Sequence, residues 1–397
     1  MASQPDAGAG SVPESAAYRQ FLPDLTIPRF TTMQTQDAHE YAAAFKQSCA
    51  PRGFIPYTFT GGGCCRNPSA ALRTMDIVGA TEDLVAKLQA NNVPFEPYHI
   101  DSPEWRTWSN PEFLLSHKGV RLDELTDELR ASAVGAMRIN GYLGELVKAP
   151  RVCNEFSYNF VLFGTPSVDT PWGFSFYGHH LCLNIFLYKG QIVVSPWFTG
   201  AEPNIIDDGP YKGTRILLEE EKLGLKLMQS LPAEQQAKAQ VYELLHDPKM
   251  PKGRWNHDDQ RHLCGAYRDN RVVPYEGVLV ADMAQEQQDL VAAIIREYNL
   301  YLPPQAKEVR VADAVSWFKE TYFCWIGSYG DDDAFYYRIQ SPVVIIEFDH
   351  HSGVFLTNKE PAKFHIHTLL RTPNAGDYGM ALRPLIPGRE QKFLWEG

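Results

Sequence analysis

Short runs of hydrophobic and aromatic residues recur from residue 155 onward, and their alternation or continuous apolarity is typical of β-strands. Two of these runs flank the dipeptide Lys189-Gly190, which predicts a hairpin with a tight turn. The strands predicted in this way cover residues 155–164, 172–188 (as one or two strands), 191–198, 321–326, 334–340, 343–349 and 363–370.

Other segments carry apolar residues three and four positions apart, which is the period of an amphipathic helix. The predicted helices cover residues 81–91, 126–148, 219–230, 232–246, 284–301 and 311–320. Helices and strands come in blocks, which favours an α+β fold with a largely antiparallel β-sheet core flanked by helices. We predict a single large catalytic domain over residues 18–397, after a disordered leader of small and polar residues at 1–17.

Composition and charge narrow the classes of function. A content of 44% hydrophobic and 21% charged residues is ordinary for a globular protein with a sizeable core. The net charge of −11, without a basic cluster, argues against binding nucleic acid or an anionic membrane surface. No apolar run approaches the roughly 20 residues that span a bilayer, and the first residues do not form a secretory signal.

Cysteine usage indicates the compartment. The seven cysteines are scattered through the chain and do not form a disulfide framework. We therefore expect a cytoplasmic protein that acts on a small-molecule substrate. The sequence does not set its oligomeric state.

The candidate chemistry lies on the predicted strands. Because successive side chains of a strand point to opposite faces, His365 and His367 share a face, as do Glu347 and Asp349. A His-x-His pair on a strand places two imidazole nitrogens where one metal ion can bind both.

A second pair of histidines, His179 and His180, precedes an apolar run that reads as part of the same strand. In a regular strand the two point to opposite faces, with His180 on the face of Cys182. Since a β-bulge would reverse this parity, the sequence leaves open which of the two faces the other histidines.

Together these segments predict a metal site with three imidazoles and one carboxylate, a set suited to iron, manganese, zinc or copper. The candidate ligands are His179, His180, Glu347, His365 and His367. We expect iron and oxidoreductase or oxygenase chemistry first, with a zinc- or manganese-dependent hydrolase or lyase as the alternative. A second alternative is a non-catalytic ligand-binding protein whose histidines are core residues.

Three further residues are candidates for handling the substrate. Arg338 and Arg371 would hold a substrate anion, and Tyr337 would donate a proton or a hydrogen bond. For the tyrosine, cross-strand packing is the alternative. The pair His350-His351 precedes Ser-Gly and predicts an exposed turn, and His262 reads as a structural partner of Asp258.

Five ordered motifs resemble a domain-of-unknown-function family, number 3500 in that series, from about residue 70 to 380. They are Trp-Arg-Thr-Trp-Ser-Asn-Pro-Glu-Phe from Trp105 with Leu-Asp-Glu-Leu from Leu122, Gly-His-His-Leu-Cys-Leu-Asn from Gly178, Pro-Tyr-Glu-Gly-Val from Pro274, Phe-Tyr-Tyr-Arg-Ile-Gln from Phe335, and Ile-Glu-Phe-Asp from Ile346 with His-Ile-His from His365. The resemblance implies one domain over nearly the whole chain and implies no particular activity.

The chain departs from the family's final motif. It has Leu-Arg-Thr from Leu370 in place of Trp-Arg-Asp, and Asp-Tyr-Gly from Asp377 in place of Asp-Phe-Gly, after an insertion around 352–363. The additional C-terminal histidines of other members are missing here, so no such histidine takes part in the predicted site.

Overall fold

The computed structural model describes residues 14–23, 74–111, 118–124, 135–150, 152–269, 271–373 and 376–386. Most of the predicted leader lies outside these residues, and its last positions begin the 3-10 helix η1 (Glu14–Phe21). Among the described helices, none combines the length and the hydropathy that a bilayer crossing requires.

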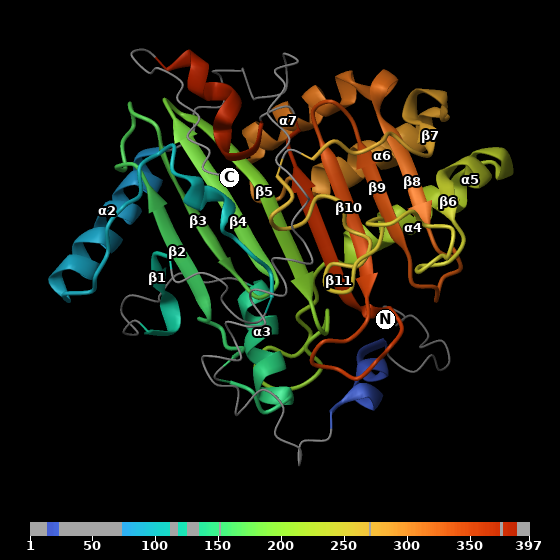
Figure 1. Ribbon diagram of the computed structural model, residues 1–397, viewed down its shortest axis with the longest axis horizontal. Helices are drawn as coiled ribbons and strands as arrows, with labels where there is room; N and C mark the ends of the chain where they lie inside the picture. The colour runs from blue at the N-terminus through green and yellow to red at the C-terminus, as the bar shows by residue number, and fades with distance from the viewer. Residues whose placement is uncertain are drawn as a thin grey trace, which may run out of the picture.

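The molecule is organised around one sheet with the strand order β1-β2-β3-β4-β5-β11-β10-β9-β8-β6, and β7 pairs with β8 (Figure 1). Neighbouring strands are antiparallel, except that β6 runs parallel to β8. The strands are β1 (Val120–Arg121), β2 (Tyr158–Phe163), β3 (Trp172–Gly178), β4 (Leu181–Tyr188), β5 (Gln191–Ala201), β6 (Gln240–Tyr242), β7 (Val278–Leu279), β8 (Tyr322–Ile326), β9 (Tyr336–Gln340), β10 (Ile345–His351) and β11 (Ala362–Arg371). The α+β fold and its largely antiparallel sheet are confirmed.

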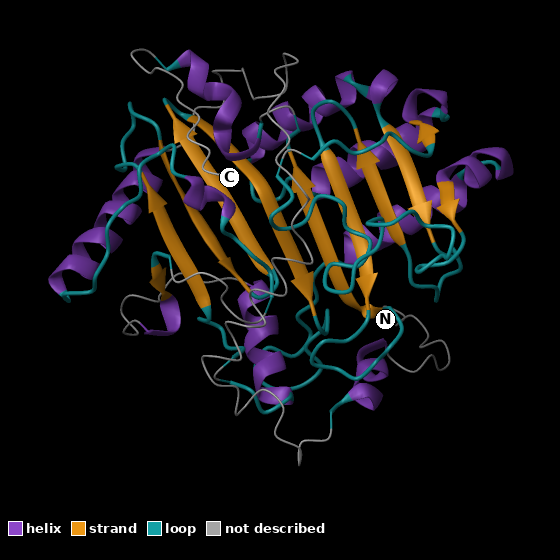
Figure 2. Cartoon of the chain, in the orientation of Figure 1, coloured by secondary structure: helices purple, strands orange, loops and turns teal. Residues whose placement is uncertain are grey.

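Helices pack on one face of the sheet, where α4 (Leu218–Ser230), α6 (Gln285–Glu297) and α7 (Pro304–Ser316) cover its β8–β11 part (Figure 2). Side chains such as Ile346 and Phe348 of β10 enter this apolar layer. The remaining helices are α2 (Thr74–Ala90), α3 (Gly135–Leu146), α5 (Ala233–Ala239) and the 3-10 helices η2 (Pro103–Arg106), η3 (Leu122–Glu124), η4 (Val280–Asp282), η5 (Phe318–Glu320) and η6 (Asp377–Leu385).

Several helix ends differ from the predictions. The helix predicted over 81–91 begins earlier, at Thr74, and the one predicted over 284–301 ends at Glu297. The helix predicted over 232–246 ends at Ala239, and the chain continues as β6, which pairs with β8. The helix predicted over 311–320 begins earlier, at Pro304, where the fixed φ of proline suits the first helical turn.

The opposite face of the sheet is polar where β9, β10 and β11 lie side by side. The register pairs Asp349 with both His367 and Tyr336, so these residues share this face with Glu347. An irregular segment over 243–276 lies against it and supplies buried charged residues such as Arg261. The charged side chains of this layer pair mainly with one another.

Candidate metal centre

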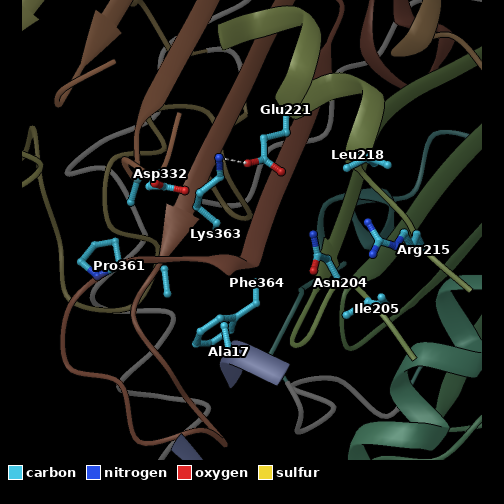
Figure 3. Close-up of a pocket in the computed structure, with 12 residues that line it drawn as sticks. Ala17, Asn204, Ile205, Arg215, Leu218, Glu221, Asp332, Pro361, Lys363 and Phe364 are labelled. Carbon is cyan, nitrogen blue, oxygen red and sulfur yellow. Dashed lines mark ion pairs between the residues drawn. The ribbon is translucent and has the colours of Figure 1, made fainter. Parts of the chain in front are cut away.

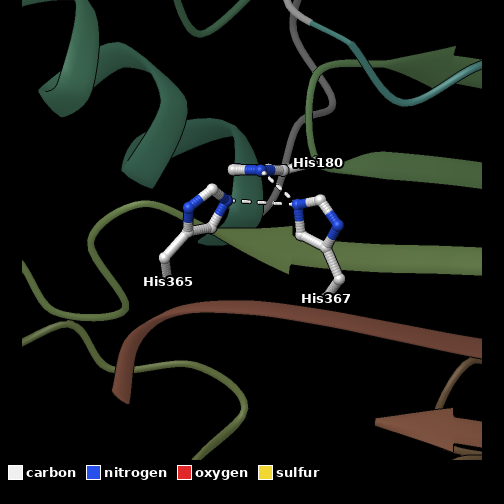
Figure 4. Close-up of side chains that lie close together, drawn as sticks. All are labelled: His180, His365 and His367. Atoms are coloured by element: carbon white, nitrogen blue, oxygen red, sulfur yellow. Dashed lines mark hydrogen bonds between the residues drawn. The ribbon is translucent and has the colours of Figure 1, made fainter. Parts of the chain in front are cut away.

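Three histidines from two segments, the turn between β3 and β4 and the strand β11, meet on the polar face. His367 lies opposite Gly200 of β5, and β5 pairs with β4, whose first residue follows His180. His365 is two residues before His367 on β11 and therefore on the same face. The strand order β4-β5-β11 thus carries His180 to the His-x-His pair. Figure 4 shows the three rings pointing toward one another.

The three imidazoles present nitrogen atoms to one another; we call His180, His365 and His367 the histidine group. The Nε2 of His367 lies 3.2 Å from the Nε2 of His180 and 3.2 Å from the Nε2 of His365. One ligand atom from each of the three lies within 4.8 Å of the others. Two nitrogens bound to one ion at 2.0–2.1 Å in tetrahedral geometry would be about 3.3 Å apart, so the spacing suits a metal.

Hydrogen bonds alone do not satisfy all the nitrogen atoms of these three rings. A neutral imidazole nitrogen has either one hydrogen or one lone pair, so His367 Nε2 can form one good N–H···N bond but not two. The Nδ1 atoms of His365 and His367 are buried without a hydrogen-bond partner. A metal ion would take the lone pairs of all three Nε2 atoms together.

Burial keeps these rings neutral, which is the state that binds metals. Removal from water lowers the pKa of His180, His365 and His367 below the usual value. It also lowers the pKa of His179 to about 3. At neutral pH each imidazole therefore has a lone pair to donate.

The prediction that His179 and His180 lie within a strand is wrong. They form the two-residue turn between β3 and β4, because Gly178 pairs directly with Leu181. His180 takes a left-handed backbone conformation (φ 60°), which costs about 1–2 kcal/mol for a non-glycine residue. As a result the two rings do not point apart but stack, with centroids 3.8 Å from each other.

His179 supports the histidine group because its ring stacks on the His180 ring. Its Nδ1 donates to Oδ1 of Asn140 at 2.8 Å, since an amide oxygen can only accept. Asn140 is held in turn by hydrogen bonds to the Asn154 carbonyl (2.8 Å) and the Ser157 hydroxyl (3.0 Å). Of the two adjacent histidines, His180 is therefore the one that faces His365 and His367.

Glu347, the predicted carboxylate ligand, has a different environment. It accepts hydrogen bonds from the backbone N–H groups of Leu263 (2.7 Å) and Cys264 (2.9 Å) and from the Tyr336 hydroxyl (2.7 Å). These contacts fasten the 243–276 segment to β10. The structure does not bring Glu347 into the histidine group, and we leave it out of the proposed ligand set.

The three residues predicted to handle substrate also have partners within the protein. Tyr337 lies on the helical face and donates to the Glu220 carbonyl at 2.9 Å. Arg338 pairs with Glu276 at 2.7 Å. Arg371 pairs with Asp269 and Asp377 at 2.8 and 2.9 Å.

Sequence reasoning missed three buried residues beside the histidine group, namely Asp259, His262 and His351. Asp259, His351 and His367 each offer a ligand atom within 4.8 Å of the others. The predicted exposed turn at His350-His351 is wrong, because both residues are buried at the end of β10. Glu347, Asp349 and His351 are spaced two residues apart. All three would have been predicted to share one face if the predicted strand had been extended by two residues.

His262 also differs from its prediction. Its neighbour is Asp259, whose Oδ1 lies 4.0 Å from His262 Nδ1, and not Asp258. Asp258 instead contacts His257 at the surface, 3.0 Å away. Both residues of the Asp259–His262 pair are fully buried.

A pocket of about 340 Å³ lies at the ends of β11 and α4 beside η1 (Figure 3). Its polar lining includes Arg215 and the ion pair of Lys363 with Glu221, whose charged atoms are 2.9 Å apart. No histidine is among the described residues that line it. The pocket is therefore distinct from the histidine group.

The fold and the site together define the class of this protein, which is an α+β protein with a buried cluster of histidines on one sheet. Residues 71–380 match the family described as "Protein of unknown function (DUF3500)", and since this is most of the chain, the protein belongs to that family. No curated protein and no solved structure matches the chain.

Proposed function

We propose that this protein is a metal-dependent enzyme for a small organic substrate, with a divalent transition metal held by His180, His365 and His367. The observation that supports this most is the pair of 3.2 Å contacts at His367 Nε2, which one proton cannot satisfy. An ion there would supply Lewis-acid or redox chemistry. His179 and Asn140 would orient the turn that carries His180.

Oxidoreductase chemistry at non-haem iron is the first reaction class that we propose. The buried Asp259 shares a second set of possible ligand atoms with His351 and His367, so a carboxylate lies beside the histidine group although Glu347 is not part of it. Mixed imidazole and carboxylate donors with open positions are typical of non-haem iron oxygenases.

A zinc-dependent hydrolase or lyase is the second candidate. The observation in its favour is that the histidine group by itself has three nitrogen donors at tetrahedral spacing. Three histidines with a bound water are a common catalytic zinc site. The identity of the bound metal separates the two candidates.

A reducing, intracellular compartment is part of the proposal. Three buried cysteines, Cys182, Cys264 and Cys324, are free thiols. Structural disulfides are rare in the cytosol and common in secreted proteins. We propose no nucleic-acid or membrane partner.

The test is elemental analysis of the full-length protein, purified without chelator, for the wild type and two variants. We expect at least one equivalent of transition metal in the wild type and a loss of on the order of tenfold or more in His365→Ala, which removes a ligand. His257→Ala, whose side chain is exposed, is the matched control and should keep the wild-type content.

Iron or copper would direct the search to oxygen-consumption assays, and zinc or manganese to hydrolysis and elimination. Wild-type protein without metal, and without thermal stabilisation when these metals are added, would contradict the proposal and favour a non-catalytic binding protein.

A further inference from the structure

A second set of buried polar atoms without partners lies next to the histidine group; we call Asp259, His262 and His351 the Asp259 group. Both carboxylate oxygens of Asp259, both ring nitrogens of His262 and the Nε2 of His351 have no hydrogen-bond partner. All three side chains are buried, with exposures of 0%, 0% and 2%. A buried carboxylate without a partner costs several kcal/mol, so a compensating cation is expected.

The geometry brings these atoms together around His367. A ligand atom of Asp259, one of His351 and one of His367 lie within 4.8 Å of one another. The His262 ring centroid is 6.1 Å from that of His351 and 6.2 Å from that of His367. Asp259 from a loop, His351 from the end of β10 and His367 from the middle of β11 thus present ligand atoms to one position, and His262 lies beside them.

Close packing holds Asp259 in this place. A Cβ added to Gly265 would lie 1.8 Å from Asp259 Oδ2, so only glycine permits the backbone to approach the carboxylate this closely. The backbone N–H of His262 donates to the Asp259 carbonyl at 3.0 Å, which closes the turn that carries both side chains. The carboxylate is therefore positioned by backbone contacts and not by a charged partner.

Two buried arginines lie near the cluster. The charge of Arg268 opposes the rise in the pKa of Asp259 that burial causes, but its guanidinium donates to the His262 carbonyl and forms no hydrogen bond with the Asp259 carboxylate. Arg261, the nearest arginine in sequence, pairs with Asp349 through its Nε at 2.6 Å and its backbone N–H at 3.2 Å. Asp349 Oδ2 also lies 3.2 Å from His351 Nε2, and Arg261 balances the charge of Asp349. The 4.0 Å between Asp259 and His262 is too long for a hydrogen bond.

We propose that Asp259, His262 and His351, together with His367, form a second metal position beside the histidine group, so that the protein holds two divalent ions. This inference rests on the proposed function, because His367 belongs to both positions. Its Nε2 faces His180 and His365, and its buried Nδ1 has no hydrogen-bond partner. For the ring to hold an ion at each nitrogen, it must release its one N–H proton to solvent and bridge the two ions as an imidazolate. The mixed oxygen and nitrogen donors suit divalent iron, manganese or zinc.

Counting bound ions tests the proposal. Metal-free full-length protein is titrated with Zn²⁺ or Mn²⁺ alone, and the metal that stays with the protein after gel filtration is measured. We expect two equivalents for the wild type, about one for Asp259→Asn and about one for His365→Ala. His257→Ala is the control and should bind two.

One equivalent in the wild type, retained in Asp259→Asn, would overturn the second position and leave the first intact. No binding in the wild type, or binding that His365→Ala does not reduce, would overturn the proposed function as well.

A spectroscopic measurement on the wild type keeps the test independent of how the variants fold. Two Mn²⁺ ions in adjacent positions give a spin-coupled electron paramagnetic resonance spectrum. We expect that spectrum at two equivalents. A six-line spectrum of isolated Mn²⁺, growing in proportion to the metal added, would overturn the proposal.

Discussion

At the scale of single residues, the histidine group depends on a glycine. Gly200 lies opposite His367 in the sheet, and the His180 ring occupies the space above it. A Cβ at this position would lie 2.7 Å from His180 Cδ2 and 3.0 Å from Cγ. Gly200 also donates its N–H to the His180 carbonyl at 2.8 Å, which fixes the turn.

We therefore predict that Gly200→Ala displaces the His180 ring and weakens metal binding by on the order of tenfold, as loss of a supporting contact does. The affinity is measured by competition with a chromophoric chelator. Gly79→Ala is the matched control, because no atom lies within 4 Å of its new Cβ in α2. An unchanged affinity in Gly200→Ala would show that His180 is not a ligand.

The residue scale also shows how far sequence reasoning reaches. The face shared by His365 and His367 follows from strand parity alone and is found in the structure. The place of His180 depends on a turn that reverses the chain between residues 178 and 181, and two histidines are unusual in such a turn. Asp259 and His262 lie in an irregular segment, where no periodicity relates a side chain to the sheet.

At the scale of elements, the strands were predictable because buried aromatic and aliphatic side chains recur along them, as in β2. Helix ends were less predictable. The sequence after Ala239 becomes a strand because β8 offers it an edge, and this tertiary partner is not visible in local periodicity. The long segment over 243–276 is fixed mainly by side chains of the strands it crosses.

Glu347 is the residue that fastens this segment, which leads to a second prediction. In Glu347→Gln an amide N–H₂ would face the N–H groups of Leu263 or Cys264, so the unfolding free energy should fall by about 1–3 kcal/mol. The metal content should stay at the wild-type level, as we assign Glu347 no ligand role. Chemical denaturation and elemental analysis measure the two effects separately.

Loss of metal from folded Glu347→Gln, with stability little changed, would instead make Glu347 a ligand. His365→Ala serves as the comparison, because it should lose metal directly.

At the scale of the whole molecule, the sheet separates two kinds of interior. Helices α4, α6 and α7 cover one face (Figure 2) and bury an apolar layer there. On the other face, carboxylates, arginines and histidines lie under an irregular segment, beside a second apolar cluster that includes Phe198 and Leu369. In the polar layer, charged groups are held away from water, which lowers the stability of the folded protein.

This division predicts how stability depends on pH in the metal-free protein. Burial lowers the pKa of His179, His180, His351, His365 and His367, so the unfolded chain binds protons that the folded chain does not. Stability is therefore present above the unfolded pKa of about 6.5 and is lost as pH falls below it. At pH 5, His179, with a folded pKa of about 3, would by itself lower the unfolding free energy by about 2 kcal/mol, and the other four histidines act in the same direction.

We expect the thermal midpoint of chelator-treated protein to fall steeply between pH 7 and pH 5. Calorimetry across this range measures it, with the His257→Ala variant as a control that should show the same slope. A midpoint that is constant over the range would mean that these imidazoles already carry protons in the folded protein.

The central claim is that imidazoles of this buried cluster bind a transition metal, and X-ray absorption at the edge of the bound metal tests it most directly. The account predicts a first shell dominated by nitrogen at 2.0–2.1 Å for zinc, with the outer-shell scattering of several imidazole rings. That imidazole scattering should be reduced in His365→Ala reloaded with the same metal. A first shell of oxygen or sulfur alone, without imidazole scattering, would contradict the account.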